Sequence, residues 1–215
     1  MGEANYKNLD QTSMIASLAI QILSIRVPAY FIPDALVATA GMDETEAISL
    51  PIEVWQKSVA EYFLVAGMNI RERKYHPITI EELKKSPYNL IRTENVYTKE
   101  SCSNTPDQTD WIIDQAIELG VSKLFFYARP YHIVRAYLTL LKSWIKSRGN
   151  LIIMIPVPLA IPPNAIVPAV VAPARSLIPG EIEKILSYQE KGDVATIEEL
   201  EKYLDVIAPI IYPNF

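Results

Sequence analysis

The sequence predicts an α/β fold with a mostly parallel sheet of about five strands. Between residues 34 and 155, short apolar runs alternate with longer segments of helical periodicity. Several of these runs are apolar throughout, as is typical of strands that are buried on both faces. Two of them end at glycine, at Gly41 and Gly67. Because strand–helix–strand units place parallel strands side by side through right-handed crossovers, this alternation favours a parallel sheet.

The composition is that of a globular chain with one core. The 215 residues are half hydrophobic and 21% charged, so we expect a single α/β domain over residues 1–215. The formal net charge of −5 argues against a nucleic-acid partner, which usually needs a basic surface. Cys102 is the single cysteine, so no intrachain disulfide can form and a reducing, cytoplasmic location is expected.

Residues 12–25 form the first predicted element, an amphipathic helix that Thr12 or Ser13 can cap. Its apolar part is shorter than the ~20 residues that a transmembrane helix needs. It also lacks the basic start and the cleavage site of a signal peptide. We therefore expect no membrane partner.

The predicted core spans residues 34–155. Its strands are expected at residues 34–39, 62–66, 95–98, 123–127 and 151–155. A helix is expected to start at Asp43 or Thr45, and Pro51 should break or restart it because proline removes a helical hydrogen bond. Thr79 should cap a short helix, and Gly120 should end the helix that follows Asn104.

The C-terminal third combines a proline-rich segment, residues 156–179, with two amphipathic helices within residues 180–208. Proline at this density opposes helix and central strand, while the remaining residues are apolar. We expect a stiff, irregular stretch against the protein surface. It could be a loop packed on its own core, or it could form a pocket wall or a subunit contact.

Two helix starts carry the polar residues of interest. Asn104 or Ser103 can act as the N-cap of one helix, with Thr105 just inside it and Asp107 in its first turn. Arg129, His132 and Arg135 follow the strand predicted at 123–127. The carboxyl ends of the strands are where α/β proteins bind ligands, so we expect these side chains to border a site.

His132 and Arg135 lie three residues apart and should share one side of a helix, near its N-terminus. Free amides there attract anions, and Arg135 and Arg129 could hold a phosphate or carboxylate as bidentate partners. His132 could then donate to the ligand or act as a general acid or base, with Asp107 as a second candidate group. In the structural alternative, His132 bonds locally, Arg135 pairs with a carboxylate, and Asn104 and Thr105 only cap their helix.

Other chemistries find less support in the sequence. Gly41 and Gly67 could let the backbone approach a ligand, or could simply form turns. The two histidines and Cys102 lack metal-ligand spacing, so no metal site is predicted. Cys102 beside His132 is a weak candidate nucleophile.

Four segments together resemble the YdcF-like family, the SanA and ElyC relatives that carry domain of unknown function 218. The matching segments are Asp34-Ala-Leu-Val-Ala-Thr-Ala-Gly41, Leu64-Val-Ala-Gly67, Asn104-Thr105 with Asp107-Gln108, and Tyr131-His132 with Arg135-Ala136. The resemblance implies a Rossmann-like, three-layer α/β/α fold with a site at the carboxyl ends of the strands. It also implies that Tyr131 belongs to the site and that S-adenosylmethionine or a nucleotide is a candidate ligand. The sequence departs from the family pattern where single glycines replace double ones and where Ala128-Arg129 replaces a Ser/Thr position.

Two functions follow from these residues. In the first, the chain binds an anionic or nucleotide-like small molecule, and could be an enzyme. Its predicted ligand-binding residues are Gly41, Gly67, Asn104, Thr105, Arg129, Tyr131 and Arg135, with His132 and Asp107 as the catalytic candidates. In the second, the chain is a non-catalytic relative whose motif has decayed and which acts as a scaffold or assembly protein through residues 156–179; a homodimer is the expected assembly.

Overall fold

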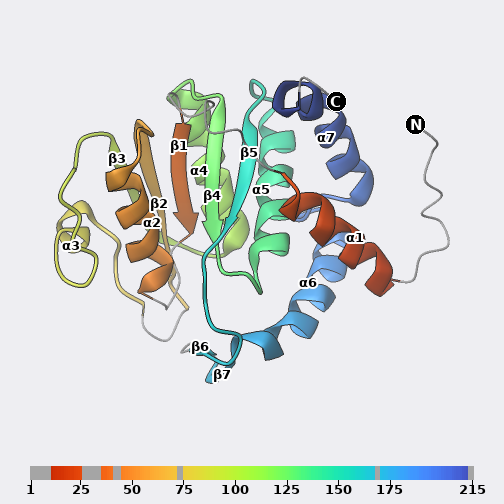
Figure 1. The fold of residues 1–215 in the computed structure, drawn as a ribbon, viewed down its shortest axis with the longest axis horizontal. Helices are drawn as coiled ribbons and strands as arrows, with labels where there is room; N and C mark the ends of the chain where they lie inside the picture. The colour runs from red at the N-terminus through yellow and green to blue at the C-terminus, as the bar shows by residue number, and fades with distance from the viewer. Residues whose placement is uncertain (1–10, 26–34, 41–44, 72–74, 168–169, 213–215) are drawn as a thin grey trace.

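A five-stranded parallel sheet forms the centre of the computed structural model, which describes residues 11–25, 35–40, 45–71, 75–167 and 170–212 (Figure 1). The strands are β1 (Ala35–Ala40), β2 (Tyr62–Asn69), β3 (Val96–Cys102), β4 (Lys123–Ala128) and β5 (Ile153–Pro158). All four pairings are parallel, and the spatial order is β3-β2-β1-β4-β5. This is the order of a Rossmann-like, doubly wound sheet, so the predicted fold class is confirmed.

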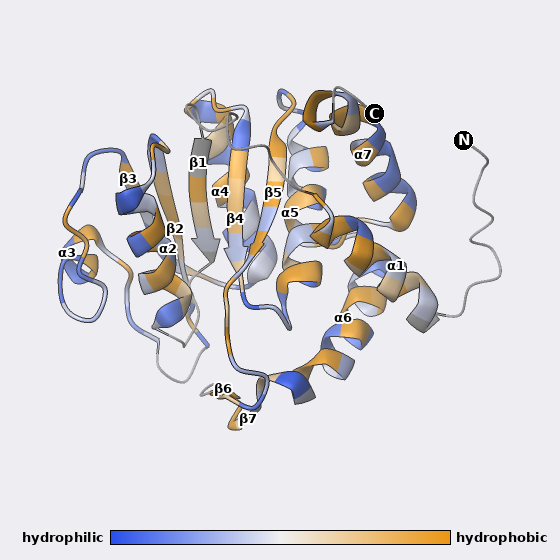
Figure 2. Ribbon diagram, viewed as in Figure 1, coloured by the Kyte–Doolittle hydropathy of each residue, from blue (hydrophilic) through white to orange (hydrophobic). Residues whose placement is uncertain are grey.

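Helices cover both faces of the sheet and complete three layers. They are α1 (Gln11–Leu23), α2 (Glu46–Lys57), α3 (Ile80–Leu83), α4 (Thr105–Glu118), α5 (Ile133–Ser147), α6 (Ile178–Glu190) and α7 (Ile197–Ile211). Alternating strand residues serve opposite cores: Leu64 and Ala66 pack with α4 and α5, whereas Phe63 and Val65 pack with α2. Both faces of the central strands are therefore apolar, and β2 and β5 are largely orange in Figure 2.

Pro51 lies inside α2, which is continuous, so the prediction that it breaks or restarts the helix is wrong. Proline leaves the carbonyl of residue 47 without its helical donor. The buried hydroxyl of Thr39 in β1 donates to that carbonyl at 2.8 Å. The sheet thus supplies the hydrogen bond that the helix loses, and Pro51 itself is buried in the contact.

Strand β2 continues through Gly67 to Asn69, beyond the predicted end at residue 66. A Cβ atom at residue 67 would overlap the carbonyl groups of Lys99 and Glu100 in β3. Glycine is therefore needed for the close approach of two strands, and the predicted role of Gly67 as a strand-ending turn is wrong. Gly120, with φ +67°, does end α4 in the left-handed conformation, as predicted.

The proline-rich segment contains more regular structure than predicted. Pro156 and Pro158 belong to β5, which tolerates them because it is an edge strand. A short antiparallel pair, β6 (Ile166–Val167) and β7 (Ala172–Pro173), follows at the bottom of Figure 1.

The last two helices extend beyond the residues predicted for them. Helix α6 starts at Ile178, and α7 runs to Ile211 with Pro209 inside it. The Tyr203 hydroxyl donates to the Ile152 carbonyl at 3.0 Å and fixes α7 against β5. Within the described ranges, no helix combines the length and the apolar character that a membrane crossing requires.

Candidate functional site

The start of α4 is held at the carboxyl end of the sheet by its own first turn. The Asn104 side chain accepts from the Asp107 amide at 2.9 Å, so the predicted N-cap is confirmed. One residue later, Gln108 Nε2 donates to the Gly67 carbonyl in β2 at 2.8 Å, and both atoms are buried. These bonds fix the helix N-terminus beside the end of β2.

Asp107 is bound within this turn. It accepts from the Ser103 amide at 2.8 Å and forms an ion pair with Lys99 of β3. Burial acts to raise the pKa of Asp107, but the bonds from Lys99 and Ser103 outweigh burial and lower that pKa. A carboxylate held ionised by Lys99 of β3 and by the Ser103 amide stabilises the start of α4.

His132 and Arg135 come together at the start of α5, where both bind Glu181 of α6. His132 Nδ1 lies 2.9 Å from Glu181 Oε2, and Arg135 Nε donates to the same oxygen at 2.6 Å. Lys184 Nζ donates to Oε1 at 2.8 Å. His132 is 6% exposed and Glu181 8% exposed, so these two groups are shielded from solvent, whereas the Lys184 side chain reaches the surface.

The charges within the cluster shift both titratable groups. Burial, followed by the charge of Arg135, lowers the pKa of His132 below its ordinary value. Burial acts to raise the pKa of Glu181, yet the hydrogen bonds and charges of His132 and Arg135 lower it far below its usual range. The internal carboxylate of Glu181 thus occupies the place beside His132 where a ligand anion was expected.

A pocket of about 380 Å³ opens next to this cluster. We call it the α4–α6 pocket, since α4, α5 and α6 border it. The described residues that line it are Asn69, Asn104, Thr105, Pro106, Arg135, Lys184, Tyr188, Lys191 and Asp193. It therefore contains three of the predicted site residues, Asn104, Thr105 and Arg135, and the two helix starts do meet at one end of the sheet.

Hydrogen-bond donors dominate the lining of this pocket. The side-chain oxygens of Asn69 and Asn104 already accept from the backbone amides of Arg71 and Asp107, so their NH₂ groups are left to face other partners. Glu181 uses Nε and Nη2 of Arg135, and Nη1 has no hydrogen bond to a described residue. Lys191 lies over the Tyr188 ring at 5.0 Å and has no ion pair within the described ranges.

The other predicted ligand-binding residues lie elsewhere. Gly41 falls outside the described residues. The Arg129 side chain is 3% exposed and faces Glu46 of α2 at 3.5 Å, away from the residues that line the pocket. Tyr131 is half-buried just before α5, and Gly67 contacts β3 and Gln108. Burial raises the pKa of Cys102 to about 11, so its thiol stays protonated and is a poor nucleophile.

Sequence analysis missed the contribution of α6. Glu181, Lys184, Tyr188 and Lys191 are spaced by three or four residues, which places them along one side of a helix. That periodicity was a usable signal of a charged face. Nothing in the sequence showed that this face would lie against α5 and the start of α4.

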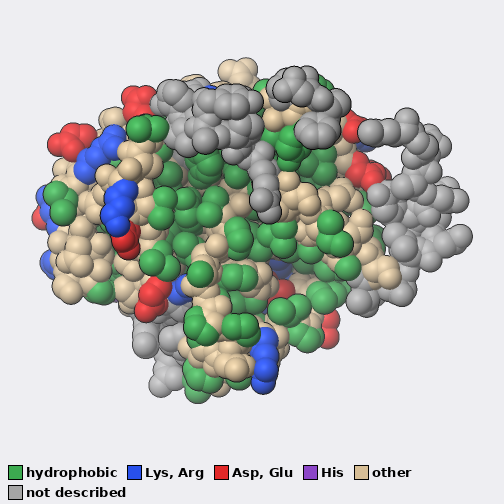
Figure 3. Space-filling view, viewed as in Figure 1, with side chains coloured by type: hydrophobic (Ala, Val, Ile, Leu, Met, Phe, Trp, Pro, Cys, Tyr) green, Lys and Arg blue, Asp and Glu red, His purple; other side chains and the backbone are tan. Residues whose placement is uncertain are grey.

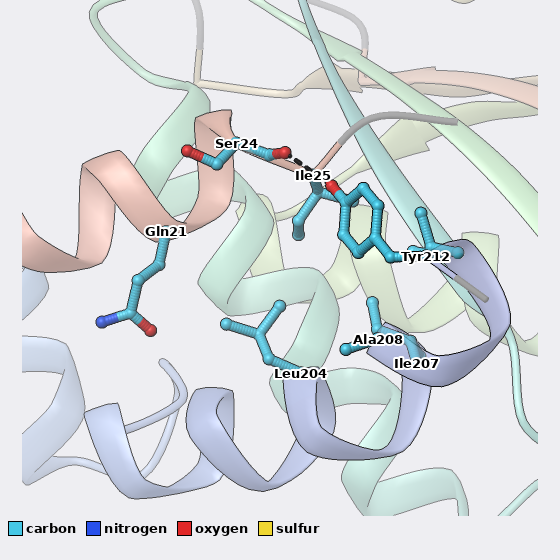
Figure 4. Close-up of a pocket in the computed structure, with 8 residues that line it drawn as sticks. Gln21, Ser24, Ile25, Leu204, Ile207, Ala208 and Tyr212 are labelled. Atoms are coloured by element: carbon cyan, nitrogen blue, oxygen red, sulfur yellow. Dashed lines mark hydrogen bonds between the residues drawn. The ribbon is translucent and has the colours of Figure 1, made fainter. Parts of the chain in front are cut away.

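A second, apolar pocket of about 210 Å³ lies between the end of α1 and α7, and we call it the α1–α7 pocket (Figure 4). Its described lining residues are Gln21, Ser24, Ile25, Leu204, Ile207, Ala208, Ile211 and Tyr212. The Tyr212 hydroxyl donates to the Ser24 carbonyl across its rim at 2.9 Å.

No family model, curated protein or solved structure matches this chain. The resemblance to the YdcF-like family therefore stays a prediction. Among the described residues, no group of three or more His, Cys, Asp or Glu side chains is arranged to hold a metal ion.

Proposed function

We propose that this protein binds an anionic small molecule in the α4–α6 pocket. The observation that carries the proposal is the convergence of three cationic side chains, Arg135, Lys184 and Lys191, on one pocket of ligand size. The N-terminus of α4 lies at the same pocket and adds the partial positive charge of its backbone amides. Glu181 already binds Arg135 and Lys184, so an anion there would bind Lys191, Nη1 of Arg135 and the remaining protons of Lys184.

Glu181 has a positioning role in this proposal. Its two oxygens hold Arg135 and Lys184 at the pocket wall, at 2.6 and 2.8 Å. A buried carboxylate holds a guanidinium in place more firmly than an exposed carboxylate would, because a buried pair is shielded from water and salt. His132 Nδ1 contacts the same Glu181 oxygen as Arg135 Nε and does not line the pocket, so we propose that it orients Glu181 and Arg135, and we propose no reaction for it.

The charge of the pocket ranks the candidate ligands. S-adenosylmethionine carries a sulfonium cation, which three neighbouring cations would disfavour. A nucleotide-like ligand presents phosphate oxygens, which Arg and Lys bind well. Membership of the YdcF-like family is compatible with either ligand and remains part of the proposal.

Phosphate binding by the Lys191→Met variant tests this function. Lys191 is exposed and makes no ion pair with a described residue, so its loss should leave folding intact. We expect inorganic phosphate to bind the unmodified chain in isothermal titration calorimetry and the variant about three- to tenfold more weakly, which corresponds to about 0.7–1.4 kcal/mol. Lys146→Met, at an exposed lysine in the last turn of α5, is the matched control. Equal binding by both variants, or no phosphate binding by the unmodified chain, would contradict the proposal.

A specific observation favours the alternative, assembly of two copies through the proline-rich segment. Ile166, Val170 and Val171 are 57%, 55% and 67% exposed around the β6–β7 pair. Apolar side chains extend from the sheet's centre down to this pair in Figure 3. Light scattering of the chain and of an Ile166→Lys, Val171→Lys variant distinguishes the two ideas: a dimer that dissociates in the variant supports assembly, whereas a monomer in both excludes it.

A further inference from the structure

Asp193 is the one lining residue of the α4–α6 pocket, within the described ranges, that offers an unpaired carboxylate. We infer that the pocket takes a phosphomonoester of a hydroxylated carbon chain or ring, such as a sugar phosphate or the ribose phosphate of a nucleotide. In this arrangement the cations hold the phosphate and Asp193 accepts from the hydroxyls. The inference rests on the proposed anion-binding function and specifies its ligand.

The position of Asp193 is fixed by the backbone. Its amide donates to the Tyr188 carbonyl at 2.9 Å, in the turn that ends α6, just after Lys191 and Gly192. The side chain is half-buried and makes no hydrogen bond or ion pair with any described residue. Although Lys191 lies close in sequence, its ammonium group faces the Tyr188 ring and does not pair with Asp193. A carboxylate in a pocket wall without an internal donor is available to a donor on the ligand.

The size and the mixed character of the pocket exclude a bare ion as its best ligand. A volume of about 380 Å³ is in the range of pockets that hold small organic molecules. Phosphate alone would reach the cations but would leave the donors at Asn69 or Asn104 unused, and it would be repelled by Asp193. An organic phosphate fills more of the pocket, and its oxygen atoms can accept hydrogen bonds from the side-chain NH₂ groups of Asn69 and Asn104.

Hydroxyl groups fit Asp193 better than an amine does. An ammonium group would be attracted by Asp193, but Arg135, Lys184 and Lys191 line the same pocket and would repel it. Neutral hydroxyls avoid that repulsion, and two neighbouring hydroxyls can donate to both oxygens of one carboxylate.

Matched ligands and one nearly isosteric variant test the inference by isothermal titration calorimetry on the full chain. The ligands are ribose 5-phosphate, 2-deoxyribose 5-phosphate and inorganic phosphate. We expect ribose 5-phosphate to bind about tenfold more tightly than either of the others, the scale of one or two hydrogen bonds to a charged group. The Asp193→Asn variant should lose that preference while its affinity for inorganic phosphate stays the same or rises. Adenosine 5′-monophosphate, as a fourth ligand, distinguishes the two ligand types. Binding tighter than that of ribose 5-phosphate indicates a nucleotide, and weaker binding indicates a free sugar phosphate.

Controls make each outcome decisive. Glu183→Gln removes one exposed charge of α6 outside the lining and should retain the preference. Thermal unfolding of both variants checks that they are folded. If all phosphates bind equally and Asp193→Asn changes nothing, the inference is wrong while the anion-binding function stands. If no phosphate binds the unmodified chain, both are wrong.

Discussion

The two pockets differ in how the chain builds them. The α4–α6 pocket gathers charged and amide side chains from β2, α4, α5 and α6, and a buried ionic cluster supports its wall. The α1–α7 pocket is lined mainly by aliphatic side chains from the ends of two helices, and the hydrogen bond from Tyr212 to the Ser24 carbonyl crosses its rim (Figure 4). The first depends on the geometry of charges, whereas the second depends on how closely two apolar helix faces pack.

This difference has energetic consequences. Glu181 has lost most of its water, and among the residues that the structure describes, His132, Arg135 and Lys184 compensate for that loss. The wall of the α4–α6 pocket should therefore be sensitive to single substitutions, to pH and to salt. The wall of the α1–α7 pocket, where Ile207 is 1% exposed, should respond to changes in volume alone.

The largest effect is expected for Glu181→Ala. The substitution leaves the largely buried guanidinium of Arg135 without its carboxylate partner, so the free energy of unfolding should fall by about 3–5 kcal/mol. Urea unfolding measures this loss. Glu183→Ala, at an exposed position of the same helix, should change stability by less than about 0.5 kcal/mol. Similar losses in the two variants would mean that the cluster does not stabilise α6.

The Glu181 cluster also marks the limit of what the sequence could predict. Helix caps at Asn104 and Thr79 and the stop at Gly120 were predictable, because each depends on a few neighbouring residues. The parallel sheet was predictable from the order of apolar runs. The contact between His132 and Glu181 joins residues 49 positions apart through the proline-rich segment, and no local pattern encodes it.

Two further misses have the same origin. In α2, the carbonyl that Pro51 leaves without a helical donor is bonded instead by the Thr39 hydroxyl, which belongs to a strand that precedes the helix. Gly67 was recognised as special, but the reason is the backbone of β3, some thirty residues later in the chain. In each case a residue from another element decides the local structure, so tertiary packing overrides a correct local rule.

A smaller effect is expected when the pH is lowered, because the pKa values of His132 and Glu181 are both below their ordinary values. As the pH falls, the unfolded chain takes up protons before the folded chain does. The stabilisation from these two groups is therefore complete above their pKa values in the unfolded chain and declines below those values. Stability should begin to fall below pH 6.5, the ordinary value of histidine, and fall further below pH 4.5, that of glutamate.

Urea unfolding, measured in buffers between pH 7.5 and 4, tests this expectation. It also distinguishes the contributions of the two pockets to stability. His132→Gln should flatten the part of the curve between neutral pH and about 5, where the histidine titrates. Ile207→Ala should lower the curve by a similar amount at every pH, about 2–4 kcal/mol, because it removes only apolar contacts. A slope that persists in His132→Gln would assign the upper part of the pH dependence to other groups.

The smallest effect is expected for Tyr212→Phe. It deletes the bond to the Ser24 carbonyl at the rim of the α1–α7 pocket, and because that bond is exposed the cost should be near 0.5 kcal/mol. Paired with Lys191→Met, this variant tests the comparison of the two pockets directly. Tyr212→Phe should lower stability slightly and leave phosphate affinity unchanged, whereas Lys191→Met should weaken phosphate binding and leave stability unchanged. If Tyr212→Phe also weakens phosphate binding, the two pockets are coupled through α7 and cannot be treated as separate regions.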